Sequence, residues 1–481
     1  MDQFFNDFTE ILTAFKDGLW NYCLIFLCLG VGIYFSVRTG FLQITYLREM
    51  LRLIFRQDTS DKGISSFQAF ALSISGRVGT GNIVGVATAI AYGGPGAVFW
   101  MWLIAFFGAS SAFVEATLAQ VYKKEINGAY RGGPAYYIEK GLGVKWYAVV
   151  FAVITIVSAG VLLPGVQSNS IAESAYHAFG FSEYAIGFLI IVLLGLIIFG
   201  GVRRIAKAAE IVVPFMAGAY ILLAVVILAL NFSQIPVMLK LIVDSALSMD
   251  ATFGGVVGAA ISWGVRRSIY SNEAGQGTAP HPAAAAEVDH PVQQGLVQGF
   301  SVYIDTLFVC TATALMILIS GQYNVQINAT GDYLVENVPG LSVTEFTQSA
   351  VAYQFPTFGN AFVAIALFFF AFTTLLAYYY YAETNVAYLF QKKESGKIVF
   401  ALRILFLGAV LFGAVKSADL AWTIGDVGVA LMALTNLIAI VLLSKVVMKV
   451  WKDYKMKLKR GDKDPKFNAE EAGIKNTDWW K

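Results

Sequence analysis

Apolar runs of about 20 residues, the length that crosses a bilayer as an α-helix, recur along most of the chain and are separated by shorter polar segments. They predict eleven transmembrane helices, and longer polar loops at 38–63 and 321–357 interrupt the series. The pattern therefore predicts an all-α polytopic membrane protein. The predicted spans are 19–37, 64–91, 95–122, 145–177, 184–200, 205–230, 252–270, 291–320, 358–390, 397–415 and 418–450.

The composition supports this class, because 57% of the residues are hydrophobic and only 14% are charged. A soluble domain carries about 25% charged residues. We divide the chain into three parts. Residues 1–63 hold an outside N-terminus, one extra helix and an inner loop; residues 64–450 form the membrane core; residues 451–481 form a basic, solvated tail.

The distribution of lysine and arginine predicts the orientation, because cytoplasmic loops are enriched in both. With the N-terminus outside, basic residues gather on the inner side, for example at 38–62, 123–145 and 203–207, and in the tail. The sequence therefore predicts an outside N-terminus and a cytoplasmic C-terminus. The outer side then receives Lys16, Lys240 and Lys416.

Glycines interrupt two of the predicted spans near their centres. The second span contains Gly76, Gly79 and Gly81, and the seventh is predicted to break at 262–265. Irregular backbone at bilayer depth is tolerated only where it is buried in protein or lines a cavity, so paired broken helices are typical of secondary transporters. Two breaks five spans apart favour a five-plus-five inverted repeat formed by spans 2–11. The alternative is that these glycines only permit close helix packing.

The first break carries the strongest candidate chemistry, in Gly79, Thr80, Gly81 and Asn82. Free amides at the start of a half-helix carry partial positive charge and can bind a carboxylate. Carbonyls on the other side of the break, such as those of Ser75 and Val78, suit a hard cation.

Hydroxyls on the ninth span, from Thr373 and Thr374, are candidates to complete the cation shell. The alternative is that both hydroxyls bond to a carbonyl of their own helix, as membrane threonines commonly do. The residues alone leave both interpretations open.

Three further side chains stand out in the predicted core. Gln167 is a polar amide inside a membrane helix that needs a partner, and Trp263 beside the predicted second break can wall a small pocket or simply pack. Arg77 lies in the first break, where an unpaired charge is costly. Its candidate partners are Glu115, Glu273 and Asp305.

The sequence shows no P-loop and no nucleophilic triad, so we expect a transporter driven by an ion gradient rather than an enzyme. A channel, which needs a continuous polar stripe, fits less well than a transporter with polar groups gathered at the breaks. A membrane amino-acid sensor that binds without moving its ligand stays open as an alternative.

Several segments resemble the alanine or glycine:cation symporter family of the amino acid–polyamine–cation superfamily. They are GRVGTGNIVGVATAI, GGPGAVFWMW, VQSNSIAES, SNEAGQGTAPHPAAAA and HPVQQGLVQGFSVYIDTLFVCTATALMIL. The resemblance implies the LeuT-like inverted-repeat fold. It also implies sodium-coupled, sometimes proton-coupled, uptake of alanine or glycine in bacteria and archaea. We further expect a monomer in the prokaryotic plasma membrane, with no cofactor besides the coupling sodium ion and no nucleic-acid partner.

The resemblance also implies roles for individual residues. Gly79, Thr80, Gly81 and Asn82 would hold the substrate carboxylate and amine, with Gln167 and Trp263 shaping the pocket. Sodium would be held by Thr373, Thr374 and the carbonyls of Ser75 and Val78. VGTGN is also similar to the VGLGN break of neurotransmitter:sodium symporters. Gly76 and Arg77 differ there from residues that bind substrate and a second sodium, which implies one sodium per cycle.

Overall fold

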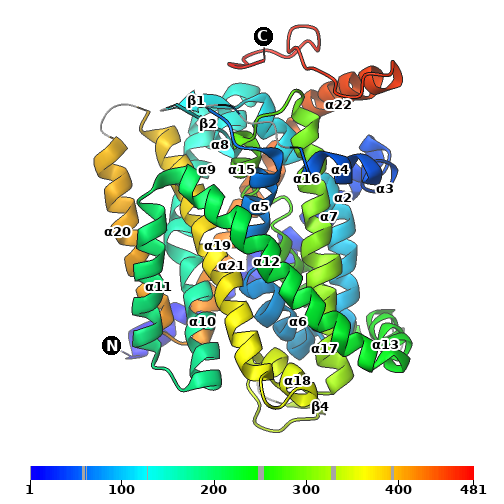
Figure 1. The fold of residues 1–481 in the computed structure, drawn as a ribbon, viewed down its shortest axis with the longest axis vertical. Helices are drawn as coiled ribbons and strands as arrows, with labels where there is room; N and C mark the ends of the chain where they lie inside the picture. The colour runs from blue at the N-terminus through cyan, green and yellow to red at the C-terminus, as the bar shows by residue number, and fades with distance from the viewer. Residues whose placement is uncertain are drawn as a thin grey trace.

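The computed structural model describes residues 2–56, 60, 62–126, 128–247, 254–326, 332–391 and 395–480. Most of these residues lie in helices that run along the long axis of one bundle (Figure 1). Two short antiparallel hairpins lie at opposite ends of it. The hairpins are β1 (Lys124–Ile126) with β2 (Ala129–Arg131), and β3 (Asn324–Gln326) with β4 (Tyr333–Glu336).

Eight helical segments among the described residues are long and apolar enough to cross a bilayer. The class predicted from the sequence, an all-α polytopic membrane protein, is confirmed, whereas the count of eleven spans and the inverted repeat stay predictions. The eight segments are Glu10–Thr39, Gly96–Val121, Lys145–Phe179, Gly201–Leu230, Pro291–Ser320, Gly359–Leu389, Gly396–Ala414 and Ala418–Leu442.

The individual elements follow these segments closely. The three other predicted spans fall on α5 with α6, on α11 and on α14. The helices are α1 Asp2–Leu19, η1 Trp20–Leu24, α2 Ile25–Thr39, α3 Leu42–Thr45, α4 Leu47–Ile54, α5 Ser66–Arg77, η2 Gly81–Gly85, α6 Val86–Gly93, α7 Gly96–Val121, α8 Pro134–Tyr137, η3 Ile138–Leu142, α9 Lys145–Val157, η4 Ser158–Leu162, α10 Pro164–Phe179, α11 Glu183–Ile198, α12 Gly201–Leu230, η5 Phe232–Gln234, α13 Ile235–Leu247, α14 Gly254–Asn272, α15 Pro280–Ala285, α16 Pro291–Val302, η7 Tyr303–Cys310, α17 Thr311–Ser320, η8 Val343–Glu345, α18 Phe346–Gln354, α19 Gly359–Leu389, α20 Ser395–Ala414, α21 Ala418–Leu442 and α22 Ser444–Lys459.

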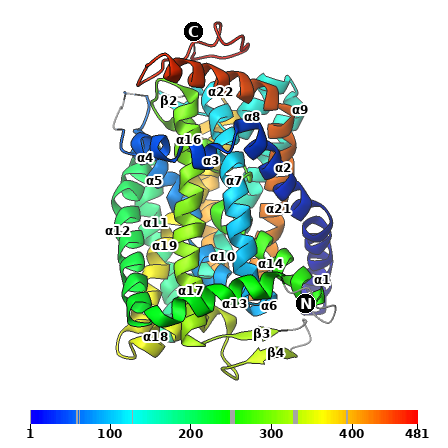
Figure 2. The same cartoon turned by 90° about the vertical axis from the view of Figure 1, so that its right-hand side faces the viewer.

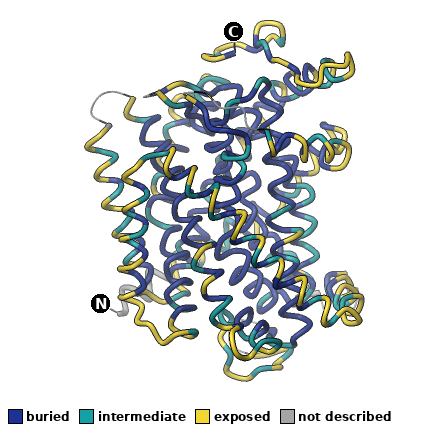
Figure 3. Tube along the Cα trace, in the orientation of Figure 1, coloured by how far each residue is buried: buried dark blue, intermediate teal, exposed yellow. Residues whose placement is uncertain are grey.

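The exposed side of the bundle remains apolar, as expected where lipid replaces water. On α12, for example, Phe215 is 76% exposed and Leu222 is 66% exposed. The interior holds α7, which packs against α14 and α16, and α19, which packs against α10. Buried residues accordingly follow the centre of the trace and exposed ones its outer edges (Figure 3).

The predicted break at 262–265 is wrong, because α14 runs without interruption from Gly254 to Asn272. Gly264 serves close packing instead: a Cβ there would lie 2.5 Å from the Ala97 carbonyl oxygen of α7. The chain leaves the helix at 273–279, where Glu273, Gly275 and Gly277 have φ of 55°, 81° and 85°. Two glycines allow this left-handed backbone at little cost.

The buried carboxylate of Glu115 on α7 holds this second interruption in place. It accepts hydrogen bonds from the amides of Gly275 (3.3 Å) and Gly277 (3.1 Å) and from the Asn436 side chain (2.7 Å). Since Glu115 is fully buried, these bonds supply polar partners to backbone groups that have left the helix.

The tail expected at 451–481 is solvated along much of its described part, but it also packs on the bundle through a few apolar side chains. Helix α22 lies across one end of the bundle, and the chain after it stays at that end, which we call the tail face (Figure 2). The Trp480 indole donates to the Gln120 carbonyl at the end of α7 (2.7 Å), and the Phe467 amide donates to the Asp289 carbonyl (2.9 Å). Phe467 and Trp480 are buried, so apolar side chains anchor this basic segment.

A buried lysine, Lys123, lies at the same contact between the tail and the bundle. The Lys123 ammonium lies 4.2 Å from the centre of the Tyr130 ring and 5.0 Å from that of Trp480. Burial lowers the pKa of Lys123 to about 7. Cation–π contacts with the rings and a hydrogen bond to the Ala286 carbonyl (3.1 Å) replace part of its hydration.

His290 ties the tail face to the start of α16 through both ring nitrogens. Nδ1 accepts a hydrogen bond from the Val292 amide (3.1 Å), which caps the helix, and Nε2 lies 3.2 Å from an Asp453 oxygen. Because Nδ1 must accept, this histidine is held neutral. Burial lowers its pKa to about 4, against the opposing effects of Asp453.

Acidification should therefore weaken the tail face. A folded pKa below the unfolded value of about 6.5 means that neutral His290 contributes stability above pH 6.5, which is lost as pH falls toward 4. Between pH 7 and pH 5 we expect a loss of about 2 kcal/mol. Thermal melting of the purified protein measures it. His290→Asn, which keeps a capping side chain, should lose correspondingly less; equal losses in both proteins would contradict this account.

Candidate functional site

The first interruption lies at the predicted place, between α5 and η2. Helix α5 begins with a capping box in which the Ser65 hydroxyl accepts from the Gln68 amide (3.1 Å), and it ends at Arg77. Val78 then has φ −79° and ψ 89°, outside the helical region. Helical structure resumes at Gly81. The Val78 amide still donates to the Ile74 carbonyl (2.7 Å), so only the amides of Gly79 and Thr80 donate to side chains in place of helical carbonyls.

Side chains from two elements satisfy the amides of this break. The Gly79 amide donates to the Asn82 side-chain oxygen (2.9 Å), and the Thr80 amide donates to that of Gln167 on α10 (3.1 Å). Asn82, Thr80 and Gln167 are at most 1% exposed. The amides therefore already point at acceptor oxygens, which is the geometry that a bound carboxylate requires.

The two adjacent threonines of α19 face different neighbours. The Thr374 hydroxyl reaches across to the Ser75 carbonyl of α5 (2.8 Å) and also donates to Phe370 on its own helix (3.0 Å). The Thr373 hydroxyl donates to Phe370 as well (3.0 Å), and otherwise contacts the Met216 sulfur on α12 (3.6 Å). Of the two threonines, only Thr374 contacts the backbone beside the break.

Close packing explains why the break needs glycine. A Cβ at Gly79 would lie 2.3 Å from the Thr374 hydroxyl oxygen and 3.1 Å from the Gln167 side-chain oxygen. A Cβ at Gly81 would lie 3.0 Å from the Ser271 Cα on α14. The backbone is thus enclosed by α10, α14 and α19.

Asp305 on η7 belongs to this cluster, although its sequence signal pointed only to a partner for Arg77. It is fully buried and accepts hydrogen bonds from Asn82 Nδ2 (2.6 Å), from the Ser271 hydroxyl (3.0 Å) and from the Thr306 hydroxyl (2.7 Å). It therefore fixes the amide orientation of Asn82. A lone acidic residue in the apolar run 291–320 was the available signal.

Arg77 finds its contacts on α16 rather than on a carboxylate. Its guanidinium, 1% exposed, donates to the Gln298 carbonyl (3.0 Å) and to the Ser301 hydroxyl. Among the described residues it makes no ion pair with the three carboxylates considered from the sequence. Its position at the C-terminal end of α5 is favourable, because that end of a helix carries partial negative charge.

Trp263 does not join the cluster around the break. Its ring stacks on Tyr92 at the end of α6 (4.8 Å between ring centres) and lies 5.0 Å from the Arg266 guanidinium. It also lines a surface cleft together with Asn21 and Trp100. Trp263 therefore contacts Tyr92 and a surface cleft rather than the residues at 78–82.

Buried ion pairs lie on either side of the break. On one side, Arg267 of α14 forms two contacts with Asp426 of α21, at 3.2 and 2.8 Å. On the tail side, Arg131 of β2 lies 3.1 Å from Glu383 of α19. Each pair joins two elements that are separate in the sequence.

A buried break of this kind, in a bundle of membrane-spanning helices, defines a transporter rather than an enzyme. The profile of the sodium:alanine symporter family matches residues 5–469. The chain therefore belongs to the sodium:alanine symporter family.

Individual relatives align with this chain over nearly their whole lengths. YrbD of Bacillus subtilis (strain 168) is 57% identical over 98% of this chain and 97% of its own. The sodium/proton-dependent alanine carrier protein of Bacillus sp. (strain PS3) is 52% identical over 90% of this chain and 97% of its own. The sodium/alanine symporter AgcS of Methanococcus maripaludis is 39% identical over 93% and 97%.

Gly79→Ala should abolish or strongly reduce alanine uptake, because the new methyl group would collide with the Thr374 hydroxyl. We expect at least a tenfold loss of initial uptake rate, equivalent to about 1.4 kcal/mol. Gly195→Ala on α11 is the matched control, since nothing lies within 4 Å of its added methyl group. Uptake by Gly79→Ala at the control rate would refute the steric account.

Proposed function

We propose that this protein carries alanine, or another small neutral amino acid such as glycine, into the cell together with a sodium ion. The observation that carries the proposal is the buried break at Val78–Thr80, with amides on one side and the Ser75 carbonyl and Thr374 hydroxyl on the other. The names of the related carriers support both ligands.

The substrate carboxylate is proposed to bind at the amides of Thr80 and Gly81. Those amides lie at the start of the second half-helix, where the helix dipole favours an anion. Gln167 accepts from Thr80 (3.1 Å), so it would exchange its oxygen for a carboxylate oxygen as the substrate enters. Asp305 supplies a buried negative charge that complements the substrate ammonium, on the side of the break where Asn82 is held.

Sodium is proposed to bind between α5 and α19. The Ser75 carbonyl and the Thr374 hydroxyl are already 2.8 Å apart and can both turn a lone pair toward one cation. The Val78 carbonyl is the third proposed ligand, because Val78 ends the helix with a non-helical backbone. Thr373 is a weaker candidate, since its hydroxyl faces Phe370 and Met216.

Transport is proposed to occur by alternating access within a five-plus-five repeat of spans 2–11, with span 1 added. The tail face would be cytoplasmic and the N-terminus outside, in a prokaryotic plasma membrane. The termini lie toward opposite ends of the bundle (Figure 1), in keeping with an odd number of spans. The basic tail face fits the same orientation.

An ion gradient supplies enough energy for accumulation. A potential of 100 mV is worth about 2.3 kcal/mol per charge, and a tenfold sodium gradient adds about 1.4 kcal/mol. One sodium ion per cycle would therefore support roughly 500-fold accumulation of a zwitterion.

Proton coupling is the second candidate function. Asp305 is fully buried and bonded only to neutral donors in the described part of the chain. Burial favours the neutral form of such a carboxyl group, so a proton can take the place of the substrate ammonium beside it. The relative from strain PS3 carries both ions in its name.

Uptake of radiolabelled alanine and glycine into proteoliposomes, with sodium and pH gradients imposed separately, decides between these functions. The proposal predicts that an inward sodium gradient alone drives uptake. Uptake driven only by the pH gradient would establish the second candidate. Binding without uptake under either gradient would leave a sensor as the function.

Adjacent threonine variants test the sodium ligands. Thr374→Ala should raise the sodium concentration for half-maximal alanine uptake about tenfold, because it removes a ligand worth about 1.4 kcal/mol. Thr373→Ala is the matched control on the next residue and should shift it less than about twofold. Sodium titrations of initial uptake rate make the comparison, and a larger effect of Thr373→Ala would reverse the assignment.

A further inference from the structure

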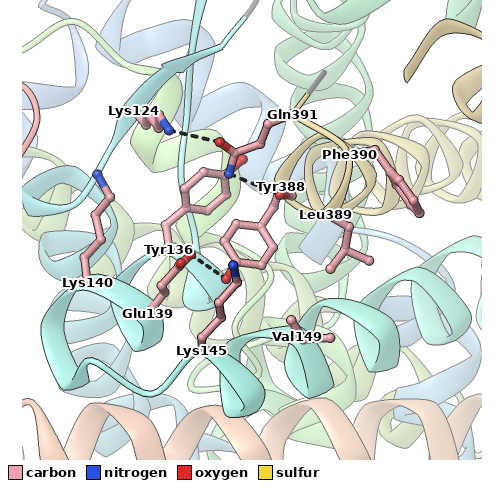
Figure 4. A pocket seen from close by; sticks show the side chains of 10 residues that line it. All are labelled: Lys124, Tyr136, Glu139, Lys140, Lys145, Val149, Tyr388, Leu389, Phe390 and Gln391. Carbon is pink, nitrogen blue, oxygen red and sulfur yellow. Dashed lines mark hydrogen bonds between the residues drawn. The ribbon is translucent and has the colours of Figure 1, made fainter. Parts of the chain in front are cut away.

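A cavity of about 570 Å³ opens on the tail face, away from the break. It lies between η3, the start of α9 and the end of α19 (Figure 4). Lysine side chains from Lys124, Lys140 and Lys145 stand on one side of it, and Leu389 and Phe390 stand on the other. The cavity therefore has a cationic wall and an apolar wall.

The cationic wall has charge left for a ligand. Lys124 donates to the neutral amide oxygen of Gln391 (3.0 Å). Lys145 also makes no ion pair within the described residues, whereas Lys140 is paired with Asp478 of the tail. Glu139, the acidic residue in the lining, is bonded to the Tyr388 hydroxyl (2.6 Å). Counted by formal charge, Lys124 and Lys145 against Glu139 leave one net positive charge for an anion.

The cavity lies where the membrane-spanning part begins. Lys145 is the first residue of the apolar segment Lys145–Phe179, and the next residue, Trp146, is 71% exposed. Phe390, which follows the last residue of α19, is 44% exposed. An exposed tryptophan beside a lysine is typical of the level of lipid headgroups.

We propose that this cavity binds the phosphodiester of an anionic phospholipid in the leaflet on the tail face. The ammonium groups of Lys124 and Lys145 would contact the phosphate, and the start of an acyl chain would lie over Val149, Leu389 and Phe390. A freely soluble phosphate ester makes no use of the apolar wall, which is why the lipid is favoured. Basic pockets between helices at this level bind anionic headgroups in membrane proteins generally. The identification of that leaflet as cytoplasmic rests on the proposed function.

Native mass spectrometry of the full-length protein, titrated with phosphatidylglycerol or phosphatidylcholine, tests the proposal. The parent protein should bind one phosphatidylglycerol about tenfold more tightly than phosphatidylcholine. Lys124→Gln/Lys145→Gln should lower the affinity for phosphatidylglycerol about tenfold or more, because each lysine near the surface contributes about a fivefold effect. Its affinity for phosphatidylcholine, whose phosphate charge is balanced by its own choline group, should fall by less.

Lys207→Gln/Lys240→Gln is the matched control, with the same loss of charge at two exposed lysines outside the cavity. It should retain the parent affinity within about twofold. Unchanged phosphatidylglycerol binding by the cavity variant, or an equal loss in the control, would overturn the proposal. If the double variant fails to purify, Lys145→Gln alone should still show about a fivefold loss.

Soluble glycerol phosphate separates the two sources of a phosphate group. It should not displace the bound phosphatidylglycerol at equal concentration. Displacement at equal concentration would assign the cavity to a free phosphate ester and overturn the lipid proposal. Sodium-dependent alanine uptake by the cavity variant would be retained, so these outcomes are independent of whether the transport proposal is correct.

Discussion

Polar backbone groups inside a membrane must be hydrogen-bonded by the protein itself, because unpaired groups cost several kcal/mol each in hydrocarbon. At Gly79 and Thr80 the backbone amides lose their helical acceptors, and neighbouring side chains replace them. The Asn82 side chain accepts a hydrogen bond from the Gly79 amide, and the Gln167 side chain accepts one from the Thr80 amide. The Thr374 hydroxyl donates to the Ser75 carbonyl. The arrangement of α10, α14, α19 and η7 around the break follows from that need.

The second interruption, at 273–279, meets the same constraint with a charge. The Glu115 carboxylate, buried on α7, accepts hydrogen bonds from the amides of Gly275 and Gly277. At the first break the backbone amides of Gly79 and Thr80 donate to neutral side-chain amides, and the buried carboxylate there, Asp305, bonds to side chains rather than to the backbone. The second is held by a carboxylate that already has three donors. This difference supports the proposal that the ligands bind at the first break, where neutral acceptors can be displaced from the amides, and that the second break has a supporting role.

The sequence was sufficient to predict the helical membrane class and the first break, because hydrophobic run length and the cluster Gly76, Gly79, Gly81 are local signals. It misplaced the second break, since Gly264 has the same local signal and is used for packing against α7. Local pattern also gave no way to separate Thr373 from Thr374, because their difference depends on which helices lie beside α19. The packing of the tail on the bundle was missed because Phe467 and Trp480 are isolated apolar residues in a basic segment.

The central claim is that a small amino acid and a sodium ion meet at Val78–Thr80. A structure of the protein determined with both ligands bound tests it most directly. The account predicts an alanine carboxylate at hydrogen-bonding distance, about 2.7–3.2 Å, from the amides of Thr80 and Gly81. It also predicts a sodium ion in contact with the Ser75 carbonyl and the Thr374 hydroxyl. Alanine bound elsewhere, for example beside Trp263, with the break unchanged, would contradict the account.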